Sequence, residues 1–459
     1  MIDLLEAGLH KAESYGVIYA ELRYLGRKDT DLIVKNGKID TSLSGFKGGL
    51  AVRCMSKTGG WGFATTYELA KDPLLNAVEA ACTLAKNTSS KIGAKLADTL
   101  SKTETGLMQS PMQKSLDDVS LEEKLSRLIE ADQIARNDDR IKSSTSRYRE
   151  FIERRIILTT LGASVEIHTT TPELSVSVVA AESGARSPAR YNRSRVCGAE
   201  FWSLFPPEEI AQKAREQSIR LLNARHCPAG DYQVVLDHDI VGLLAHEAVG
   251  HCAEADIAAA GSYLEGKLNQ PVASELISMT DAPTGKSSCW VPVDDEGIQA
   301  RPVTIVENGI LKEFMTNLSY AVEFDSPSTG NARAWSFDEM PLIRMRNTFI
   351  ESGDHSFEEL LESVRNGLFI RSAFGGQADS SGEFMFGFRE AQPIMDGELQ
   401  EEYLQGSAIS GNAFDVLKAA FAVGKAFKLD LRGLCGKGQY VKIDAGGAQL
   451  GTTARIGGR

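Results

Sequence analysis

The chain has 459 residues, enough for two or three domains, and its 42% hydrophobic and 24% charged residues are typical of an ordinary globular protein. A formal net charge of −12 excludes a broadly basic surface that would attract the nucleic acid backbone, so we expect no direct contact with nucleic acid. The sequence opens without a basic region followed by an apolar core, and it has no apolar run of membrane-spanning length, which predicts a soluble cytoplasmic protein without membrane contact.

The first part of the chain alternates helical and strand-like segments. Leu4, Leu5 and Leu9 recur at helical spacing, and Gly16 ends the predicted helix. Asn36-Gly37 is a strong signal for a hairpin turn, because both positions need positive φ. The expected strands are 19–24, 31–35, 49–55 and 60–65, and a second helix is expected over 73–87.

The middle of the chain predicts a connection, a helix and a long antiparallel ribbon. Segment 101–117 is mixed and polar, and Ser120 with Glu123 forms the capping box of a helix that runs to about Arg136. Pro228-Ala229-Gly230 then interrupts the pattern. The ribbon is expected over 152–160, 163–171 and 174–181, followed by a helix over 207–224. We therefore expect an N-terminal domain of residues 1–225 and a C-terminal domain of residues 226–459.

The second domain is predicted to be rich in strands. Turns at Asn308-Gly309 and Asp396-Gly397 separate short strand patterns. One helix is expected from the capping box at Ser356 to Gly367, and another over 412–426. The whole pattern predicts an α+β fold of two domains, with antiparallel or mixed sheets, flanking helices and a β-rich C-terminal domain.

An apolar segment in the second domain contains His246, Glu247 and His251. Imidazole is the commonest zinc ligand from proteins, and a carboxylate beside the bound water is the usual base. Histidines five residues apart diverge by roughly 140° on a regular helix, so they could not share an ion there. We therefore expect the helix to be distorted near Gly250. The alternative is a chance pattern, or two histidines hydrogen-bonded within the core.

The seven cysteines are scattered and form no C-x-x-C pair, so they do not predict a disulfide framework. Cys435 lies in a glycine-rich segment beside Lys437, which predicts a loop that carries a thiolate. Cys252 directly follows His251, and because adjacent helical side chains point about 100° apart, we expect Cys252 to pack in the core. Glycine clusters such as Gly375-Gly376 favour turns over a nucleotide-binding loop, since no helix opens directly after them.

Small residues and an arginine follow one another in segment 328–333, which predicts a loop. Such a loop could hold the carboxylate or the backbone of a substrate. Asn331 and Arg333 are therefore the candidate substrate-binding residues, with a surface turn and a structural arginine as the alternative.

Two motifs together resemble the TldD/PmbA family of metalloproteases, and within it the TldD branch that carries the metal motif. The first is His246-Glu247-Ala248-Val249-Gly250-His251 with Glu254, and the second is Gly433-Leu434-Cys435-Gly436-Lys437. The resemblance extends over nearly the whole chain. It also includes segments 48–53, 62–64, 328–333, 344–348, 375–377 and 386–391.

The resemblance implies that His246, His251 and Cys435 bind Zn²⁺ and that Glu247 is the catalytic base. Three protein ligands with one open position are typical of catalytic zinc. The implied activity is that of a zinc-dependent peptidase, which cleaves unfolded or short peptides held in extended form in a cleft by means of zinc-activated water. Members of the family act as dimers, so the expected partner is a second copy or a related subunit that lacks the metal motif.

Two alternatives remain at this point. A regulatory or binding protein of the gyrase-modulator type would contain a structural or vestigial metal site, and a structural site is closed by a fourth side chain. Copper also binds two histidines and a cysteine, but an electron-transfer site needs a weak axial ligand and gives Glu247 no role.

Overall fold

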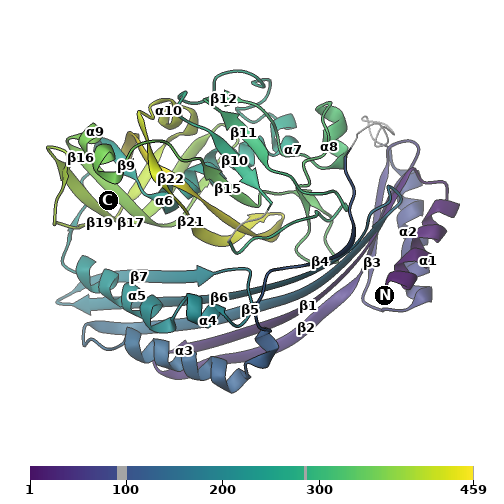
Figure 1. The fold of residues 1–459 in the computed structure, drawn as a ribbon, viewed down its shortest axis with the longest axis horizontal. Helices are drawn as coiled ribbons and strands as arrows, with labels where there is room; N and C mark the ends of the chain where they lie inside the picture. Colours follow the sequence, from purple (N-terminus) through teal and green to yellow (C-terminus); the bar gives the residue numbers. More distant parts are fainter. Residues whose placement is uncertain (90–100, 284–286, 458–459) are drawn as a thin grey trace.

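The computed structural model describes residues 1–89, 101–283 and 287–457. Within these residues a long curved sheet of seven strands faces a second unit built around a sheet of thirteen strands (Figure 1). Helices flank both sheets, and strands predominate in the second unit, so the predicted α+β class is confirmed.

The first sheet is a series of long antiparallel strands in the order β3-β2-β1-β5-β6-β4, with β7 beside β6. Asn36 and Gly37 make the predicted hairpin turn, with φ of 51° and 78°. Segments 19–24 and 31–35 belong to one continuous strand, because Gly26 to Thr30 keeps pairing with both neighbours. The strands are β1 Tyr19–Lys35, β2 Lys38–Met55, β3 Trp61–Thr66, β4 Thr105–Gln109, β5 Ile141–Thr159, β6 Ser164–Glu182 and β7 Ala185–Ser194.

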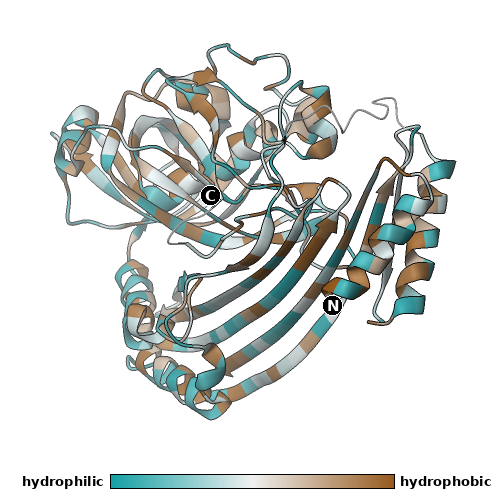
Figure 2. Ribbon diagram, turned by 45° about the vertical axis from the view of Figure 1, so that its right-hand side comes forward, coloured by the Kyte–Doolittle hydropathy of each residue, from teal (hydrophilic) through white to brown (hydrophobic). Residues whose placement is uncertain are grey.

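The two faces of the first sheet have different partners. Side chains alternate between the faces of a strand. On β5, Tyr148 and Ile156 pack in two helix-covered cores, whereas Phe151, Glu153 and Arg155 face the second unit. Figure 2 shows the hydropathy changing from residue to residue along these strands. The covering helices are α1 Ile2–Ser14, α2 Lys71–Asn87, a 3₁₀ turn Leu116–Asp118, α3 Leu121–Ala135, α4 Phe201–Leu204 and α5 Pro207–Leu221.

The second sheet is mixed, as predicted, in the order β12-β11-β10-β15-β22-β9-β16-β17-β19-β8. Strand β22 is central to it, because it pairs with β15 in parallel and with β9, β20 and β21 antiparallel. Its strands are β8 Arg225–His226, β9 Gly230–Leu236, β10 Met279–Ala282, β11 Val303–Glu307, β12 Ile310–Leu311, β15 Asn347–Ile350, β16 Gly367–Ala378, β17 Glu383–Met395, β18 Glu398–Leu399, β19 Leu404–Gln405, β20 Ala408–Asn412, β21 Ala422–Lys437 and β22 Gln439–Gly457. The short pair β13 Ala332–Arg333 and β14 Leu342–Ile343 lies outside this sheet.

Helix α6, which leads to the two histidines, lies directly on this sheet. A Cβ at Gly242 would lie 2.8 Å from the backbone nitrogen of Gly446 in β22, so the contact requires glycine. The remaining helical segments are α6 His238–Leu243, a π-helical turn Leu244–Gly250, a 3₁₀ turn His251–Ala253, α7 Ala255–Ala259, α8 Leu318–Glu323, α9 Phe357–Val364 and α10 Ala413–Lys418. The α9 capping box at Ser356 is confirmed.

Three predicted elements are wrong. The helix expected over 412–426 ends at Lys418, because the chain from Ala422 pairs with β22 over a long antiparallel ladder. The same ladder places Cys435 in strand β21 rather than in a loop, with the turn only at Gly438. Segment 101–117 contains β4, which pairs with β6 in parallel. In each case pairing over a long sequence distance overrides the local pattern.

The predicted turn at Gly375-Gly376 is also wrong, since this pair lies in an irregular part of β16. The first sheet contains only strands that precede residue 195, and the second only strands that follow residue 224. The domain boundary between residues 225 and 226 stays a prediction. Among the described residues no helix is both long and apolar enough to span a membrane.

Candidate metal centre

The chain carries its two motif histidines on a π-helical turn. The backbone N–H of His251 donates to the carbonyl of His246, a bond across five residues that defines this helix type. Five residues therefore make about one turn, and the two imidazoles lie on the same face, with ring centroids 5.0 Å apart. The predicted distortion of the helix is confirmed.

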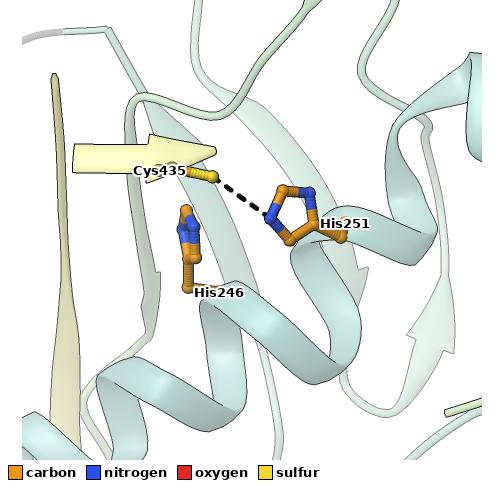
Figure 3. Close-up of side chains that lie close together, drawn as sticks. All are labelled: His246, His251 and Cys435. Atoms are coloured by element: carbon orange, nitrogen blue, oxygen red, sulfur yellow. Dashed lines mark hydrogen bonds between the residues drawn. The ribbon is translucent and has the colours of Figure 1, made fainter. Parts of the chain in front are cut away.

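The third member of the cluster comes from β21. Ligand atoms of His246, His251 and Cys435 all lie within 4.8 Å of one another (Figure 3). The Cys435 Sγ atom is 3.2 Å from Nε2 of His251. Residues separated by more than 180 positions thus converge on one point.

The donor set fits a metal ion. His246 is only 2% exposed, and neither of its ring nitrogens has a hydrogen-bond partner among the described residues. A buried imidazole without a partner is costly unless another group, such as a cation, satisfies it. Burial raises the pKa of the Cys435 thiol, but the imidazoles of His246 and His251 offset this and lower it to about 5. Two imidazoles and a thiolate match the ligands that zinc prefers.

Glu247 lies at the edge of this cluster. Its Oε2 atom is 3.8 Å from Nε2 of His251, and its side chain is 25% exposed. The glutamate is therefore beside the ligand atoms and accessible to solvent. Within the described residues the cluster contains three candidate ligands and no fourth histidine, cysteine or carboxylate.

Behind the histidines, a buried carboxylate links both motifs. The Glu254 carboxylate lies 3.4 Å from Nδ1 of His251 and accepts a 2.6 Å hydrogen bond from Lys437. Lys437 also donates to Asp256 and to the carbonyl of Ile343. Burial opposes the charge on Glu254, but His251 and Lys437 lower its pKa to about 2. A carboxylate behind a ligating histidine orients the ring.

Two further residues shape the site, and their roles were not predicted. Arg344 is fully buried and donates to the carbonyls of Cys435 and Gln439, at 2.8 and 2.9 Å. Met345 packs against the π-helical turn, since a Cβ at Gly250 would lie 2.2 Å from its Sδ atom. The sequence signal for both was the segment Arg344-Met345-Arg346, which places two arginines directly after the apolar run Pro341-Leu342-Ile343.

The predicted substrate-binding residues are buried. The Asn331 amide donates to Asp281 and to the carbonyl of Arg344. Arg333, 9% exposed, donates to the carbonyls of Met345 and Lys442 and lines a cavity beside the first sheet. Neither belongs to the His-His-Cys cluster, and their contact with substrate stays a prediction.

Cys252 and His238, which flank the motif in the sequence, lie outside the cluster. Cys252 is 2% exposed and packs in the core of the second unit, as predicted. The Nδ1 atom of His238 lies 2.8 Å from the carbonyl of Gly447.

Family models match three consecutive parts of the chain. Residues 20–85 match domain 1 of the PmbA/TldA metallopeptidases, residues 114–222 match the central domain, and residues 229–449 match the C-terminal domain. The chain belongs to the TldD/PmbA family of metallopeptidases. Its motif residues therefore lie in the part that corresponds to the family's C-terminal domain.

Curated relatives in this family are named as metalloproteases. The chain is 34% identical to a metalloprotease of Methanocaldococcus jannaschii, over 95% of this chain and 96% of the relative. It is also 34% identical to a zinc metalloprotease TldD homolog of Saccharolobus solfataricus, over 68% of this chain and 70% of the relative. Among solved structures, TldE from Thermococcus kodakarensis has the same fold, with a TM-score of 0.79 at 18% identity over 99% of this chain and 100% of the other. These similarities support a metallopeptidase of the TldD/PmbA family.

Proposed function

We propose that this chain is a zinc-dependent peptidase that cleaves unfolded or short peptides bound in extended form. The observation that carries the proposal is the convergence of His246, His251 and Cys435 beside the accessible carboxylate of Glu247. The thiolate and the two imidazoles would hold the zinc ion, which supplies a Lewis acid when it is bound. The relative from Saccharolobus solfataricus is named a zinc metalloprotease, and this name supports zinc as the metal.

In this proposal the carboxylate of Glu247 moves the protons. It takes one proton from the attacking water and passes it to the nitrogen of the leaving amine. Its position four residues before His251 keeps it on the same side of the helix as that ring. Glu254 and Lys437 hold the His251 ring in place, while Arg344 fixes the strand end that carries Cys435.

We also propose that the chain works in the cytoplasm as a homodimer or together with a related subunit that lacks the metal motif. The similarity in fold to TldE supports a partner of that kind. Light scattering measures the molar mass of the purified chain without a second subunit. A dimer mass supports self-association, and a monomer mass supports dependence on the related subunit.

The first experiment compares the wild-type chain with Glu247→Gln. Zinc content is measured by elemental analysis, and cleavage of unstructured peptides by mass spectrometry. We expect one zinc per chain in both proteins and cleavage by the wild type only. Removal of a general base typically slows turnover about 10²- to 10⁴-fold. Zinc without cleavage in either protein would instead favour the regulatory function with a structural metal site, and cleavage by the variant would exclude Glu247 as the base.

A further inference from the structure

A cavity lies where the first sheet meets the second unit, and its volume is about 70 Å³. That is several times the space that one water molecule requires. Its floor is one face of the β5–β6 ribbon, where three cross-strand pairs meet. These pairs are Phe151–Thr171, Glu153–Thr169 and Arg155–Ile167. Its opposite wall comes from residues 288–293, 333–335 and 441–442 of the second unit.

This cavity adjoins the strand that carries Cys435. Val441 in the cavity wall is the register partner of Cys435, and the two side chains belong to one small apolar cluster. Neighbouring strands lie about 4.8 Å apart, and an extended peptide spans about 3.4 Å per residue. One or two residues of an extended peptide therefore span the gap between β21 and β22, the neighbouring strands that carry Cys435 and Val441.

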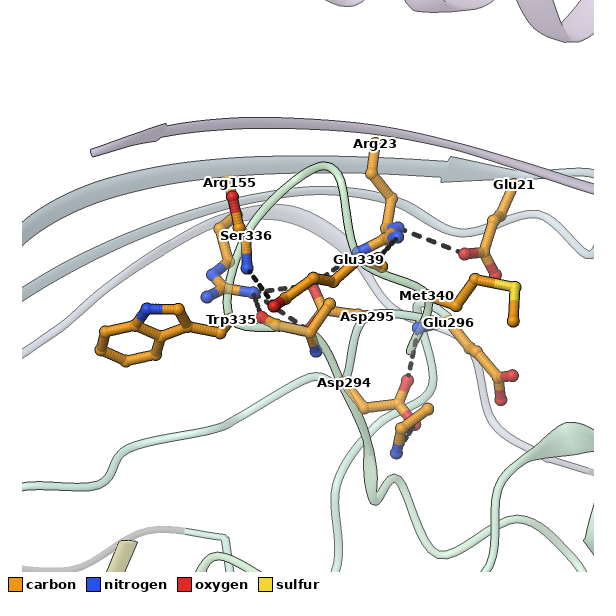
Figure 4. Close-up of polar contacts among 12 residues, drawn as sticks. Glu21, Arg23, Arg155, Asp294, Asp295, Glu296, Trp335, Ser336, Glu339 and Met340 are labelled. Carbon is orange, nitrogen blue, oxygen red and sulfur yellow. Dashed lines mark hydrogen bonds and ion pairs between the residues drawn. The ribbon is translucent and has the colours of Figure 1, made fainter. Parts of the chain in front are cut away.

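One cation of the cavity wall, Arg333, forms no ion pair with any described residue. Arg155 pairs with Asp295 at 2.8 Å and lies 3.4 Å from Glu153, while Lys442 pairs with Glu173 (Figure 4 shows Arg155 and Asp295). In the part of the chain that the structure describes, no carboxylate oxygen lies within 4.0 Å of Arg333, whose guanidinium donates only to the carbonyls of Met345 and Lys442. Those two bonds use two of its five N–H groups.

The surroundings of Arg333 disfavour an unpaired charge. Burial lowers the pKa of Arg333 most, and Arg344 and Arg155 also lower it, while Cys289 and Asp295 raise it without reversing the net decrease. A carboxylate in the cavity would supply the missing counter-charge in a water-poor site, where charge-assisted hydrogen bonds are strong. Trp290 and Trp335 line the same cavity and offer apolar surface next to this cation.

We propose that this cavity is a substrate subsite, in which Arg333 binds a peptide carboxylate while the adjoining apolar group of the peptide packs against Trp290 and Trp335. The proposal rests on the peptidase function proposed above and names its substrate class. The carboxylate belongs either to the C-terminus of a short peptide or to an aspartate or glutamate side chain.

The experiment measures binding without cleavage, in the zinc-loaded full chain with Glu247→Gln, by fluorescence anisotropy of labelled peptides. One peptide pair differs only in a C-terminal acid or amide, and a second pair differs only in an internal Glu or Gln. We expect about tenfold tighter binding of the acid member of at least one pair, as a charge-assisted contact provides. Because cleavage is not the readout, an inactive wild type does not affect the result.

Two variants in this background test the site itself. Arg333→Gln should abolish the acid preference while zinc content is unchanged. Thr169→Phe fills the cavity from the ribbon and should weaken binding of the preferred peptide about tenfold. Arg225→Gln, at an arginine whose side chain is 75% exposed, is the matched control and should keep the preference.

A preference in the first pair assigns the C-terminal carboxylate, and a preference in the second pair assigns an acidic side chain. Equal binding within both pairs overturns the proposal. An acid preference that survives both Arg333→Gln and Thr169→Phe overturns it as well.

Discussion

The ammonium group of Lys437 lies 2.6 Å from the buried carboxylate of Glu254. Glu254 follows His251 by three residues, and Lys437 follows Cys435 by two, so this ion pair joins the segments that carry the candidate ligands. The same carboxylate faces Nδ1 of His251 at 3.4 Å. The pair therefore fixes the histidine segment and the cysteine strand relative to each other.

Glu254→Gln should weaken zinc binding. The variant removes the charge that orients the His251 ring, and loss of such a partner typically costs 10- to 100-fold in metal affinity. Competition with a chromophoric chelator measures the affinity. Glu275→Gln, at an exposed glutamate, serves as the control, and equal affinities in both variants would show that the ion pair has no role in metal binding.

Arg344→Lys should also weaken zinc binding, although it keeps the positive charge. A lysine has no planar fork that could bond the carbonyls of both Cys435 and Gln439. The turn between β21 and β22 therefore loses one of its two hydrogen bonds from residue 344. We expect roughly a tenfold loss of zinc affinity, of the order found when a supporting partner is removed. The matched substitution Arg365→Lys, at an exposed position, should leave the affinity unchanged.

Gly250→Ala should destabilise the fold, even though alanine favours helices. The added Cβ would lie 2.2 Å from Sδ of Met345 and 2.9 Å from the carbonyl oxygen of Ala245. Overpacking of this kind typically costs 1–3 kcal/mol, against about 1 kcal/mol gained from helix propensity. Urea denaturation of the variant and the wild type measures the change in the free energy of unfolding.

A second substitution separates the two contacts. Met345→Ala alone should destabilise the fold by about 2–5 kcal/mol, because Met345 is buried and its truncation leaves a cavity. The double variant Gly250→Ala/Met345→Ala should lose less stability than the sum of the two single variants, because the sulfur contact needs both side chains. Gly45→Ala is the control, because a Cβ there would meet no atom of the described residues within 4 Å. A Gly250→Ala variant more stable than the wild type would contradict the close contact.

Stability should decrease in acid because of Glu173, which joins β6 of the first sheet to Lys442 of the second. Burial opposes its charge, but Lys442 and Arg149 lower the pKa of Glu173 to about 2. The folded-state pKa is below the unfolded one, so the stabilisation is complete above about pH 4.5 and is lost as the pH falls towards 2. It amounts to about 3 kcal/mol.

Glu173→Gln should remove this part of the pH dependence, as measured by urea unfolding between pH 3 and pH 7. The control is Asp231→Asn, because Asp231 belongs to an exposed ion pair with Arg455 and such pairs contribute little. If the two variants had the same pH profile as the wild type, Glu173 would not stabilise the contact between the sheets.

Elements specified by local chemistry were predicted from the sequence. The Asn36-Gly37 turn needs positive φ at both residues, and the Ser356 capping box satisfies the first N–H groups of its helix. Both signals are local, so neighbouring residues suffice to determine them. The distortion between His246 and His251 was predictable for a similar reason, since a regular helix would separate the two rings.

The sequence by itself determined the helix-to-strand pattern of the first half except for β4, together with the histidine motif and the residue types that suit zinc. Local patterns did not place Cys435 beside the histidines, although the family resemblance implied it. The tertiary structure decided it, because the β21–β22 ladder replaces the helical pattern after Lys418 and positions the Cys435 thiol 3.2 Å from His251, a residue 184 positions earlier in the chain. The roles of Arg344, Lys437 and the cavity around Arg333 were likewise decided by the tertiary structure. They depend on which distant carbonyls and carboxylates surround each cation, and contacts of that kind leave no periodic signal in the chain.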